Sequence, residues 1–211
     1  DAAEPYREPS NALATEFLRA ARPAPTLAPK VGVARMSRRI LLLFSGAYTR
    51  PDGLVAYLQR HDLEVVPVDN DPALGDKSHD VLIDTFYSDL LRRAQRGEFL
   101  AVWAAPPCST FSVARFRRIA GGPSVVRRRP PDQVAQALDC PAKNRSEVRK
   151  SNELVSRTIN ILRAAHNAGS EFGIESPADH GDTHQPDLFV DADHAPLWVV
   201  PEIIALKTDT E

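Results

Sequence analysis

The sequence predicts an α/β protein whose sheet is mostly parallel and carries helices on both faces. Two observations support this prediction. From residue 38 onward, short apolar runs alternate with segments of helical periodicity, which is the order that βαβ units require. Small, acidic or thiol-bearing residues also follow several of these runs directly, as expected where parallel strands end at one edge of a sheet.

The first part of this region predicts two strands separated by a helix. The run RILLLF at 39–44 is apolar throughout, which is typical of a strand buried on both faces. Residues 52–61 carry apolar side chains at helical spacing, and residues 63–69 form a second apolar run that ends in acidic residues. We therefore expect a strand, a helix and a strand in this order.

The middle of the chain continues the alternation. The run VLID at 81–84 predicts a short third strand that ends in an aspartate. Residues 87–98 predict an amphipathic helix, which Gly97 closes because glycine accepts the left-handed conformation at a helix end. Residues 99–105 predict the fourth strand.

The last part predicts one long helix and a fifth strand. Residues 152–169 form the longest amphipathic pattern of the chain and stop at a glycine. Residues 171–176 follow as a strand, which Pro177 stops because proline cannot donate to a sheet ladder.

The composition limits the classes of protein to which this chain can belong. The chain has 211 residues, of which 43% are hydrophobic and 26% charged, as in globular domains that bury one good-sized core. The net charge of −2 excludes a global basic field, so a nucleic-acid partner would meet a local patch. No apolar run is long enough for a bilayer, and two cysteines make no disulfide framework. We expect an intracellular monomer with free thiols and no membrane contact.

The N-terminal residues differ from the rest. Residues 1–37 hold five prolines among many alanines, and the only methionine of the chain is Met36. We interpret residues 1–37 as a Pro/Ala-rich linker or upstream extension and residues 38–211 as the folded domain.

The residues that follow the predicted strands suggest a ligand site at one rim of the sheet. Ser45 and Gly46 let a backbone approach a ligand closely, and Asp69 lies 23 residues after Gly46. An acid about 20 residues beyond a glycine turn commonly holds ribose hydroxyls, which points to an adenosine-containing cofactor. The chain lacks G-x-G-x-x-G, so a dinucleotide site is not expected. Asp69 and Asp84 are equally compatible with roles as helix caps.

Cys108 adds a candidate nucleophile to this rim. A thiolate is a strong nucleophile when nearby positive charge lowers the pKa of the thiol. Glu175 brings a carboxyl group to a neighbouring strand end, where we expect partial burial to raise its pKa. The alternatives without a functional role are a buried structural thiol at Cys108, a backbone-amide acceptor at Glu175 and a loop thiol at Cys140. A basic segment follows Cys108 and suits either phosphate binding or a solvated loop: Arg115, Arg117, Arg118, Arg127, Arg128 and Arg129.

Five motifs together resemble the cytosine carbon-5 methyltransferases. They stand in the order of that family and cover roughly residues 39–177: LFSG (43–46), VDND (68–71), IDTF (83–86), APPCSTFS (105–112) and GIESP (173–177). Residues 145–162 are also similar to the helix that precedes the family's Glu-Asn strand end. Pro-Pro-Cys is the most specific of these elements.

The resemblance implies a Rossmann-like S-adenosylmethionine-dependent methyltransferase fold that modifies a flipped cytosine, in DNA rather than RNA. It implies that Cys108 attacks carbon 6 of the base and that Glu175 protonates or hydrogen-bonds ring nitrogen 3. It also implies a set of cofactor-binding residues, in which Asp69 holds the ribose and Asp84 the adenine amine: Phe44, Ser45, Gly46, Asp69, Asn70, Asp84 and Pro106.

The sequence departs from the family pattern in ways that keep other functions open. The glycine after Gly46 comes only at Gly53, Ser109 replaces the usual glutamine, and the family's later motifs and target-recognition region are missing. The alternatives are a non-catalytic relative that binds cofactor or nucleic acid as a module of a larger protein, and a different cysteine enzyme such as a hydrolase. His180 and His184 stand at i and i+4, but no thiolate completes a site, so we expect no metal.

Overall fold

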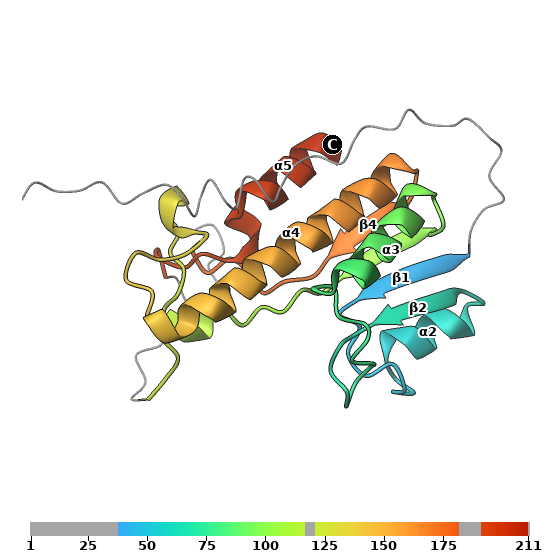
Figure 1. The fold of residues 1–211 in the computed structure, drawn as a ribbon, viewed down its shortest axis with the longest axis horizontal. Helices are drawn as coiled ribbons and strands as arrows, with labels where there is room; N and C mark the ends of the chain where they lie inside the picture. The colour runs from blue at the N-terminus through green and yellow to red at the C-terminus, as the bar shows by residue number, and fades with distance from the viewer. Residues whose placement is uncertain (1–37, 117–120, 182–190, 211) are drawn as a thin grey trace, which may run out of the picture.

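The structure is a computed structural model that describes residues 38–116, 121–181 and 191–210. Its centre is a four-stranded sheet of order β2-β1-β3-β4, in which all three neighbouring pairs are parallel (Figure 1). The predicted α/β class with a parallel sheet is confirmed. The strands are β1 (Arg39–Leu43), β2 (Glu64–Val68), β3 (Ala101–Ala104) and β4 (Glu171–Ile174). The helices are α2 (Leu54–Arg60), α3 (Asp84–Gln95), α4 (Arg145–Asn167) and α5 (Pro201–Thr210).

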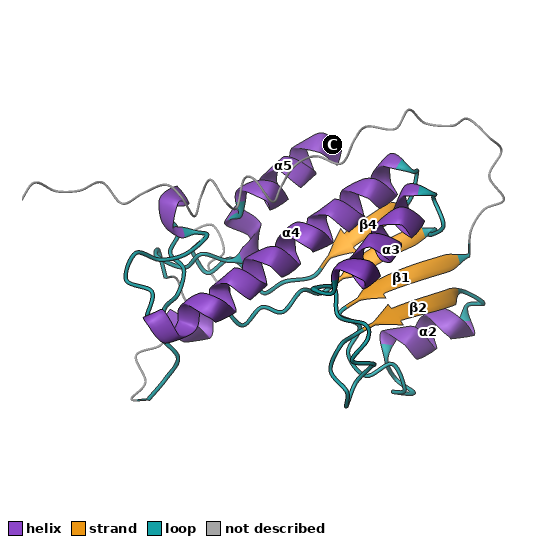
Figure 2. Ribbon diagram, viewed as in Figure 1, coloured by secondary structure: helices purple, strands orange, loops and turns teal. Residues whose placement is uncertain are grey.

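The apolar sequence of β1 explains why helices cover both faces of the sheet (Figure 2). Side chains alternate along a strand, so Leu41 and Leu43 face one side and Ile40 and Leu42 face the other. The first pair belongs to the large core that α3 and α4 complete, and the second pair packs with Val55 of α2. Helices on both faces are thereby confirmed.

The strand predicted for residues 81–84 is wrong. The Asp80 carboxylate accepts the backbone N–H of Leu82 at 2.8 Å, and the Asp80 carbonyl accepts that of Ile83 at 2.9 Å. This turn leads directly into α3, whose first residue is Asp84. The short apolar run therefore enters a helix, and Val81 is buried there without joining a sheet.

Two predicted helices begin earlier than their apolar pattern indicated. α3 starts at Asp84 rather than residue 87, and α4 starts at Arg145 rather than residue 152. The first turn of α4 is mostly polar, and α3 begins with Asp84 and Thr85, so apolar periodicity does not mark where either helix begins. Among the described helices none is long and apolar enough to cross a membrane. The expected linker of residues 1–37 lies outside the described residues.

The second face of the sheet is covered less completely than the first in the described part of the chain. Trp103 on β3 remains 41% exposed, although β3 lies between two other strands. A Cβ built on Gly173 of β4 would come within 2.5 Å of the Trp103 ring. The indole therefore lies across β4, on a position that only glycine leaves open.

Candidate functional site

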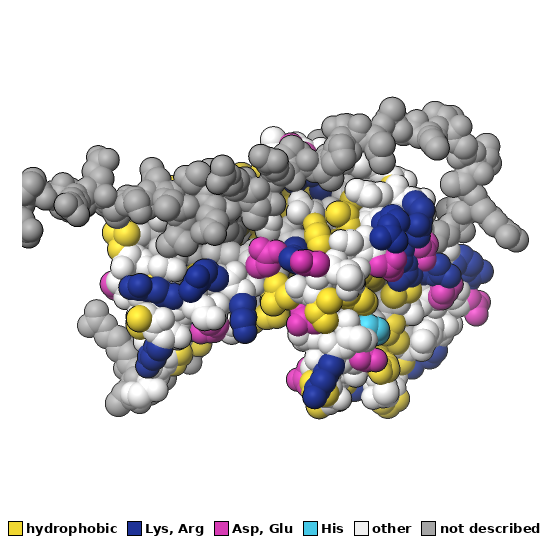
Figure 3. Space-filling model, viewed as in Figure 1, with side chains coloured by type: hydrophobic (Ala, Val, Ile, Leu, Met, Phe, Trp, Pro, Cys, Tyr) yellow, Lys and Arg dark blue, Asp and Glu magenta, His cyan; other side chains and the backbone are white. Residues whose placement is uncertain are grey.

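The carboxyl ends of the strands meet at one edge, as the sequence predicted. The Ser45 N–H donates to the Val68 carbonyl at 3.1 Å, and the Glu175 N–H donates to the Ala104 carbonyl at 2.8 Å. These bonds join the segments that follow β1 and β4 to the ends of β2 and β3. Figure 3 shows the molecule hollowed between the loops after β1 and β2 and the N-terminal half of α4. The edge is therefore the place where a ligand would reach all four segments.

A hydrogen-bonded turn shapes the end of β1. Phe44 and Gly46 both have positive φ, of 60° and 65°, and the Gly46 N–H donates to Asp69 Oδ2 at 3.0 Å. Asp69 Oδ1 accepts the Asp71 N–H at 2.9 Å, while Asn70 is exposed. A Cβ on Gly46 would meet nothing within 4 Å, so the backbone here faces open space. Each Asp69 oxygen keeps a lone pair, so this cradle fits a hydroxyl-bearing ligand.

Asp84 does not lie with these groups at a strand end. It is the first residue of α3, its side chain is 86% exposed, and Arg157 of α4 donates to its Oδ1 at 2.6 Å. Arg157 also donates to Glu153 at 2.6 Å and stacks over the Tyr87 ring at 4.7 Å. Asp84 therefore joins α3 to α4, which corrects its predicted place at the end of a strand.

Cys108 lies in the loop of residues 105–112 that follows β3. Pro106 is buried, and the Cys108 thiol is half-buried. The Phe111 N–H donates to the Cys108 carbonyl at 2.9 Å, so the backbone turns back directly after the cysteine. Glu175 follows the neighbouring strand β4 and is exposed, so the partial burial expected for it is wrong.

Arg115, the first arginine after Cys108, binds the protein itself. Arg115 donates to the Ser109 carbonyl at 2.5 Å and to Glu147 of α4 at 2.6 Å, and only 9% of its side chain is exposed. Ser109 also donates through its hydroxyl to Glu147 at 3.2 Å. Arg115 and Glu147 therefore tie the Cys108 loop to the start of α4.

Arg127 is the clearest departure from a solvated basic loop. It is 2% exposed, and its guanidinium donates to Thr110 Oγ1 at 3.1 Å and to the carbonyls of Val134 and Ala135 at 2.9 Å each. It also stacks over the Phe111 ring, 4.0 Å from the centroid. Burial lowers the pKa of Arg127 to about 9. A phosphate cannot reach this side chain in this conformation, which corrects its predicted nucleic-acid contact.

The next two arginines bind acidic residues. Arg128 bridges Asp139 at 2.9 Å and Asp193 at 3.0 Å, and Arg129 pairs with Asp179. On the face drawn in Figure 3, basic side chains lie beside acidic ones rather than in one continuous basic area. The predicted phosphate contacts at Arg117 and Arg118 lie outside the described residues.

His194 contacts the Cys108 loop, and the sequence analysis missed it. Its side chain is fully buried, and its Nε2 lies 2.8 Å from the Phe111 carbonyl. Burial lowers the pKa of His194. The histidine stands at the end of a polar segment, and only the apolar run directly after it signals a return to the core.

The second cysteine has a structural role. Cys140 is 3% exposed and packs with Val126, Ala137 and Val148. Burial is the main cause that raises the pKa of its thiol. Cys140 lies outside regular secondary structure, as the expected loop thiol would, and it is buried in a small core.

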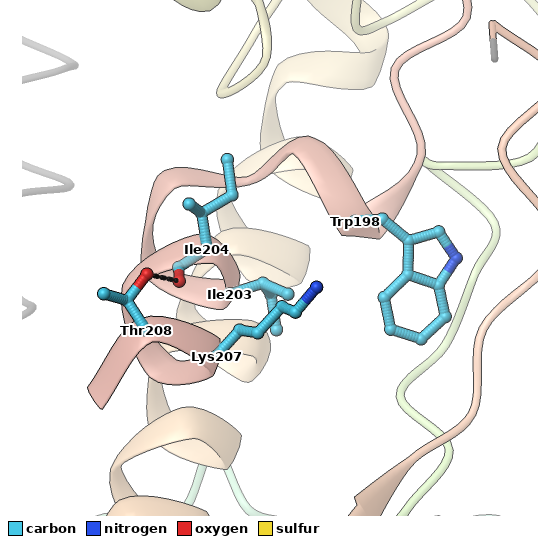
Figure 4. Close-up of a pocket in the computed structure, with 5 residues that line it drawn as sticks. All are labelled: Trp198, Ile203, Ile204, Lys207 and Thr208. Carbon is cyan, nitrogen blue, oxygen red and sulfur yellow. Dashed lines mark hydrogen bonds between the residues drawn. The ribbon is translucent and has the colours of Figure 1, made fainter. Parts of the chain in front are cut away.

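An open cavity of about 570 Å³ lies beside α5. Figure 4 shows the Trp198 indole facing this helix, with the Lys207 amine between them. The Trp198 indole N–H donates to the Pro177 carbonyl at 2.9 Å, which ties this segment to the chain after β4. The lining residues are Trp198, Ile203, Ile204, Lys207 and Thr208.

Among the described residues, no three or more histidine, cysteine or acidic side chains gather as metal ligands would, and His184 lies outside them. No protein-family model, no curated protein and no solved structure matches this chain.

Proposed function

We propose that the protein transfers a methyl group from S-adenosylmethionine to carbon 5 of cytosine in DNA. One observation carries this proposal: a cysteine loop after β3, an acid after β4 and a glycine–aspartate cradle after β1 and β2 share one hollowed edge. The all-parallel sheet with helices on both faces is consistent with a Rossmann-like methyltransferase fold. We choose this reaction because five ordered motifs of the sequence resemble those of the cytosine carbon-5 methyltransferases.

Cys108 and Glu175 would act on the base. The Cys108 thiolate forms a bond to carbon 6 while Glu175 hydrogen-bonds or protonates ring nitrogen 3, which accepts the charge that develops on the ring. Carbon 5, which gains the electron pair displaced from the carbon 5–carbon 6 double bond, would take the methyl group, and the methyl–sulfur bond would break to leave S-adenosylhomocysteine. Loss of the carbon 5 proton to solvent expels the Cys108 thiolate and restores the double bond. The thiol is half-buried and the acid is exposed, so solvent reaches both, as an extruded base would have to.

The cradle of Gly46 and Asp69 would hold the cofactor. Asp69 would accept ribose hydroxyls, and the open backbone at Gly46 would lie against the methionine end, with Phe44 and Ser45 beside it. S-adenosylmethionine would supply an electrophilic methyl group at this edge. Asn70 and Pro106 flank the same edge.

Calorimetric titration of the chain with S-adenosylmethionine tests this function. We expect micromolar binding that Asp69→Asn weakens at least about tenfold, because the amide replaces one carboxylate oxygen by a donor. The matched control is Asp62→Asn, which changes an exposed carboxylate at the opposite end of β2. Binding then justifies trapping Cys108 on DNA that contains 5-fluorocytosine, with Cys108→Ser as its control. A folded chain that binds no cofactor would contradict the proposal.

A second candidate is a relative that binds the cofactor without turnover. The arginines favour it, because the four described members of the predicted basic segment, Arg115, Arg127, Arg128 and Arg129, all have protein partners. Cofactor binding without a covalent adduct on 5-fluorocytosine DNA would support this second function.

A further inference from the structure

The loop of residues 105–112 has no regular secondary structure in its Cys108 part, so other groups must fix its conformation. Its Ala105 N–H donates to the Leu43 carbonyl at 3.1 Å, and the two prolines that follow have no N–H to donate. Beyond them the loop holds itself only by the turn from Phe111 to Cys108. Arg115 and Glu147 hold the loop at Ser109, and two further side chains from distant segments, Arg127 and His194, are buried against Thr110 and Phe111 within this turn.

Arg127 holds the side chains of the loop. Its Nε donates to Thr110 Oγ1 at 3.1 Å, and Thr110 Oγ1 shares a 2.8 Å hydrogen bond with Ser151 Oγ of α4. The same guanidinium lies 4.0 Å from the Phe111 ring centroid. The planar fork thus orients two consecutive residues of the loop, which a single ammonium group could not do.

His194 holds the backbone of the loop. Its Nδ1 accepts the His180 backbone N–H at 3.2 Å, so in the neutral ring the proton is on Nε2. Nε2 then donates to the Phe111 carbonyl at 2.8 Å. The Phe116 ring meets the imidazole edge-on, with centroids 5.7 Å apart. Both ring nitrogens are therefore used, and one of them fixes the residue three places after Cys108.

We propose that Arg127 and His194 are positioning residues that hold the loop of residues 105–112 so that Cys108 stays half-buried at the edge of the sheet. Arg127 fixes Thr110 and Phe111 from one side, and His194 fixes the Phe111 carbonyl from another. The purpose of this arrangement rests on the proposed function, because it keeps the nucleophile in one orientation. The basic run after the cysteine thus contributes to the internal support of the site.

The test measures the loop directly in the full chain. Cys140→Ala leaves Cys108 as the sole thiol, whose alkylation by iodoacetamide is followed by mass spectrometry, together with amide hydrogen exchange. In this background we expect Arg127→Lys and His194→Asn each to raise exchange at residues 108–112 and the Cys108 alkylation rate by about tenfold. Exchange in β1 and α4 should stay unchanged.

Two controls separate positioning from general destabilisation. His194→Gln keeps an amide donor near the position of Nε2, so it should restore most of the protection that His194→Asn loses. Arg163→Lys changes an arginine of α4 that pairs with Asp209, away from the loop, and should behave as the parent. Unchanged exchange and alkylation in both folded variants would overturn the proposal, as would a rise spread evenly over the core.

These measurements need neither cofactor nor DNA. A chain that fails to bind S-adenosylmethionine would remove the proposed function, whereas the exchange and alkylation data would still decide whether Arg127 and His194 hold the loop. The two failures are therefore distinguishable.

Discussion

The carboxylate of Asp69 accepts the backbone N–H of Gly46, and this bond joins the ends of two neighbouring strands at 3.0 Å. Gly46 has a φ of 65°, and Asp69 is half-buried. Together with the bond from the Ser45 N–H to the Val68 carbonyl, this bond therefore holds a turn in which Phe44 and Gly46 have left-handed backbone. The aspartate supports the cradle before any ligand arrives.

Replacing this carboxylate should cost stability. We expect Asp69→Ala to lower the free energy of unfolding by about 1–2 kcal/mol, because the N–H groups of Gly46 and Asp71 both lose their acceptor. Asp69→Asn should lose about half as much, since one oxygen remains to accept. Urea unfolding measures both, with Asp62→Asn as the surface control. Equal stability of Asp69→Ala and the parent chain would show that the turn does not depend on this bond.

The burial of Glu202 predicts that the protein loses stability as the pH rises. Its side chain is 8% exposed, neither carboxylate oxygen has a hydrogen-bond partner on another described residue, and burial raises its pKa. Folding then favours the protonated form, so stability is present below the unfolded pKa and is lost as pH rises through the folded pKa. Glu202→Gln should stabilise the chain by about 1–2 kcal/mol at pH 8 and by almost nothing at pH 4.

Urea titrations across this pH range check the expectation. The control is Glu171→Gln at an exposed position on β4, which should change stability little at either pH. A gain from Glu202→Gln of the same size at both pH values would contradict the role assigned to the buried charge.

The sequence predicted the sheet well because its strands are buried runs with strong turn signals. β1 reads as five consecutive apolar or amphipathic residues, and its neighbours end where acids or prolines begin. The run at 81–84 was equally apolar, but periodicity in four residues cannot separate a strand from the entry to a helix. The side chain of Asp80 decided between them by capping the turn.

The partners of the candidate site were less predictable. The edge that carries Cys108, Asp69 and Glu175 follows from strand order alone. The burial of Arg127 does not follow, because a basic run normally marks a solvated surface. Its partners, Thr110 and Phe111, lie about 17 residues earlier in the chain, and no local pattern connects them.

The position of the Trp103 indole should require a glycine at residue 173. A methyl group there would lie within 2.5 Å of the ring, so Gly173→Ala must displace the indole. We expect a loss of about 1 kcal/mol and a shift in tryptophan emission, measured with Trp198→Phe to isolate Trp103. In a Trp103→Ala background the same change should cost nothing, because the clash is gone. A cost that survives in that background would place the strain elsewhere on β4.

The burial of His194 predicts that the protein loses stability as the pH falls, which is opposite to the effect of Glu202. Burial is the main effect and lowers its pKa. Of the groups near it, the Phe111 carbonyl, Asp179 and Asp191 raise the pKa, whereas His180 lowers it. The folded state therefore favours the neutral ring, so its stability is fully present above the unfolded pKa of about 6.5 and is lost as pH falls through the folded pKa.

His194→Gln carries no proton at any of these pH values and lacks this dependence. The variant should be less stable than the parent by about 1 kcal/mol at pH 7.5, because it loses the acceptor for the His180 N–H. The difference in stability between the variant and the parent should be smaller at pH 5. At that pH the unfolded parent chain protonates His194, whereas in the folded chain Nδ1 already accepts the His180 N–H, so the parent loses stability. Denaturant titrations at both pH values measure it, with exposed His61→Gln as the control. A difference that grows toward low pH would mean that His194 is charged in the folded protein and that its Nδ1 does not accept from His180.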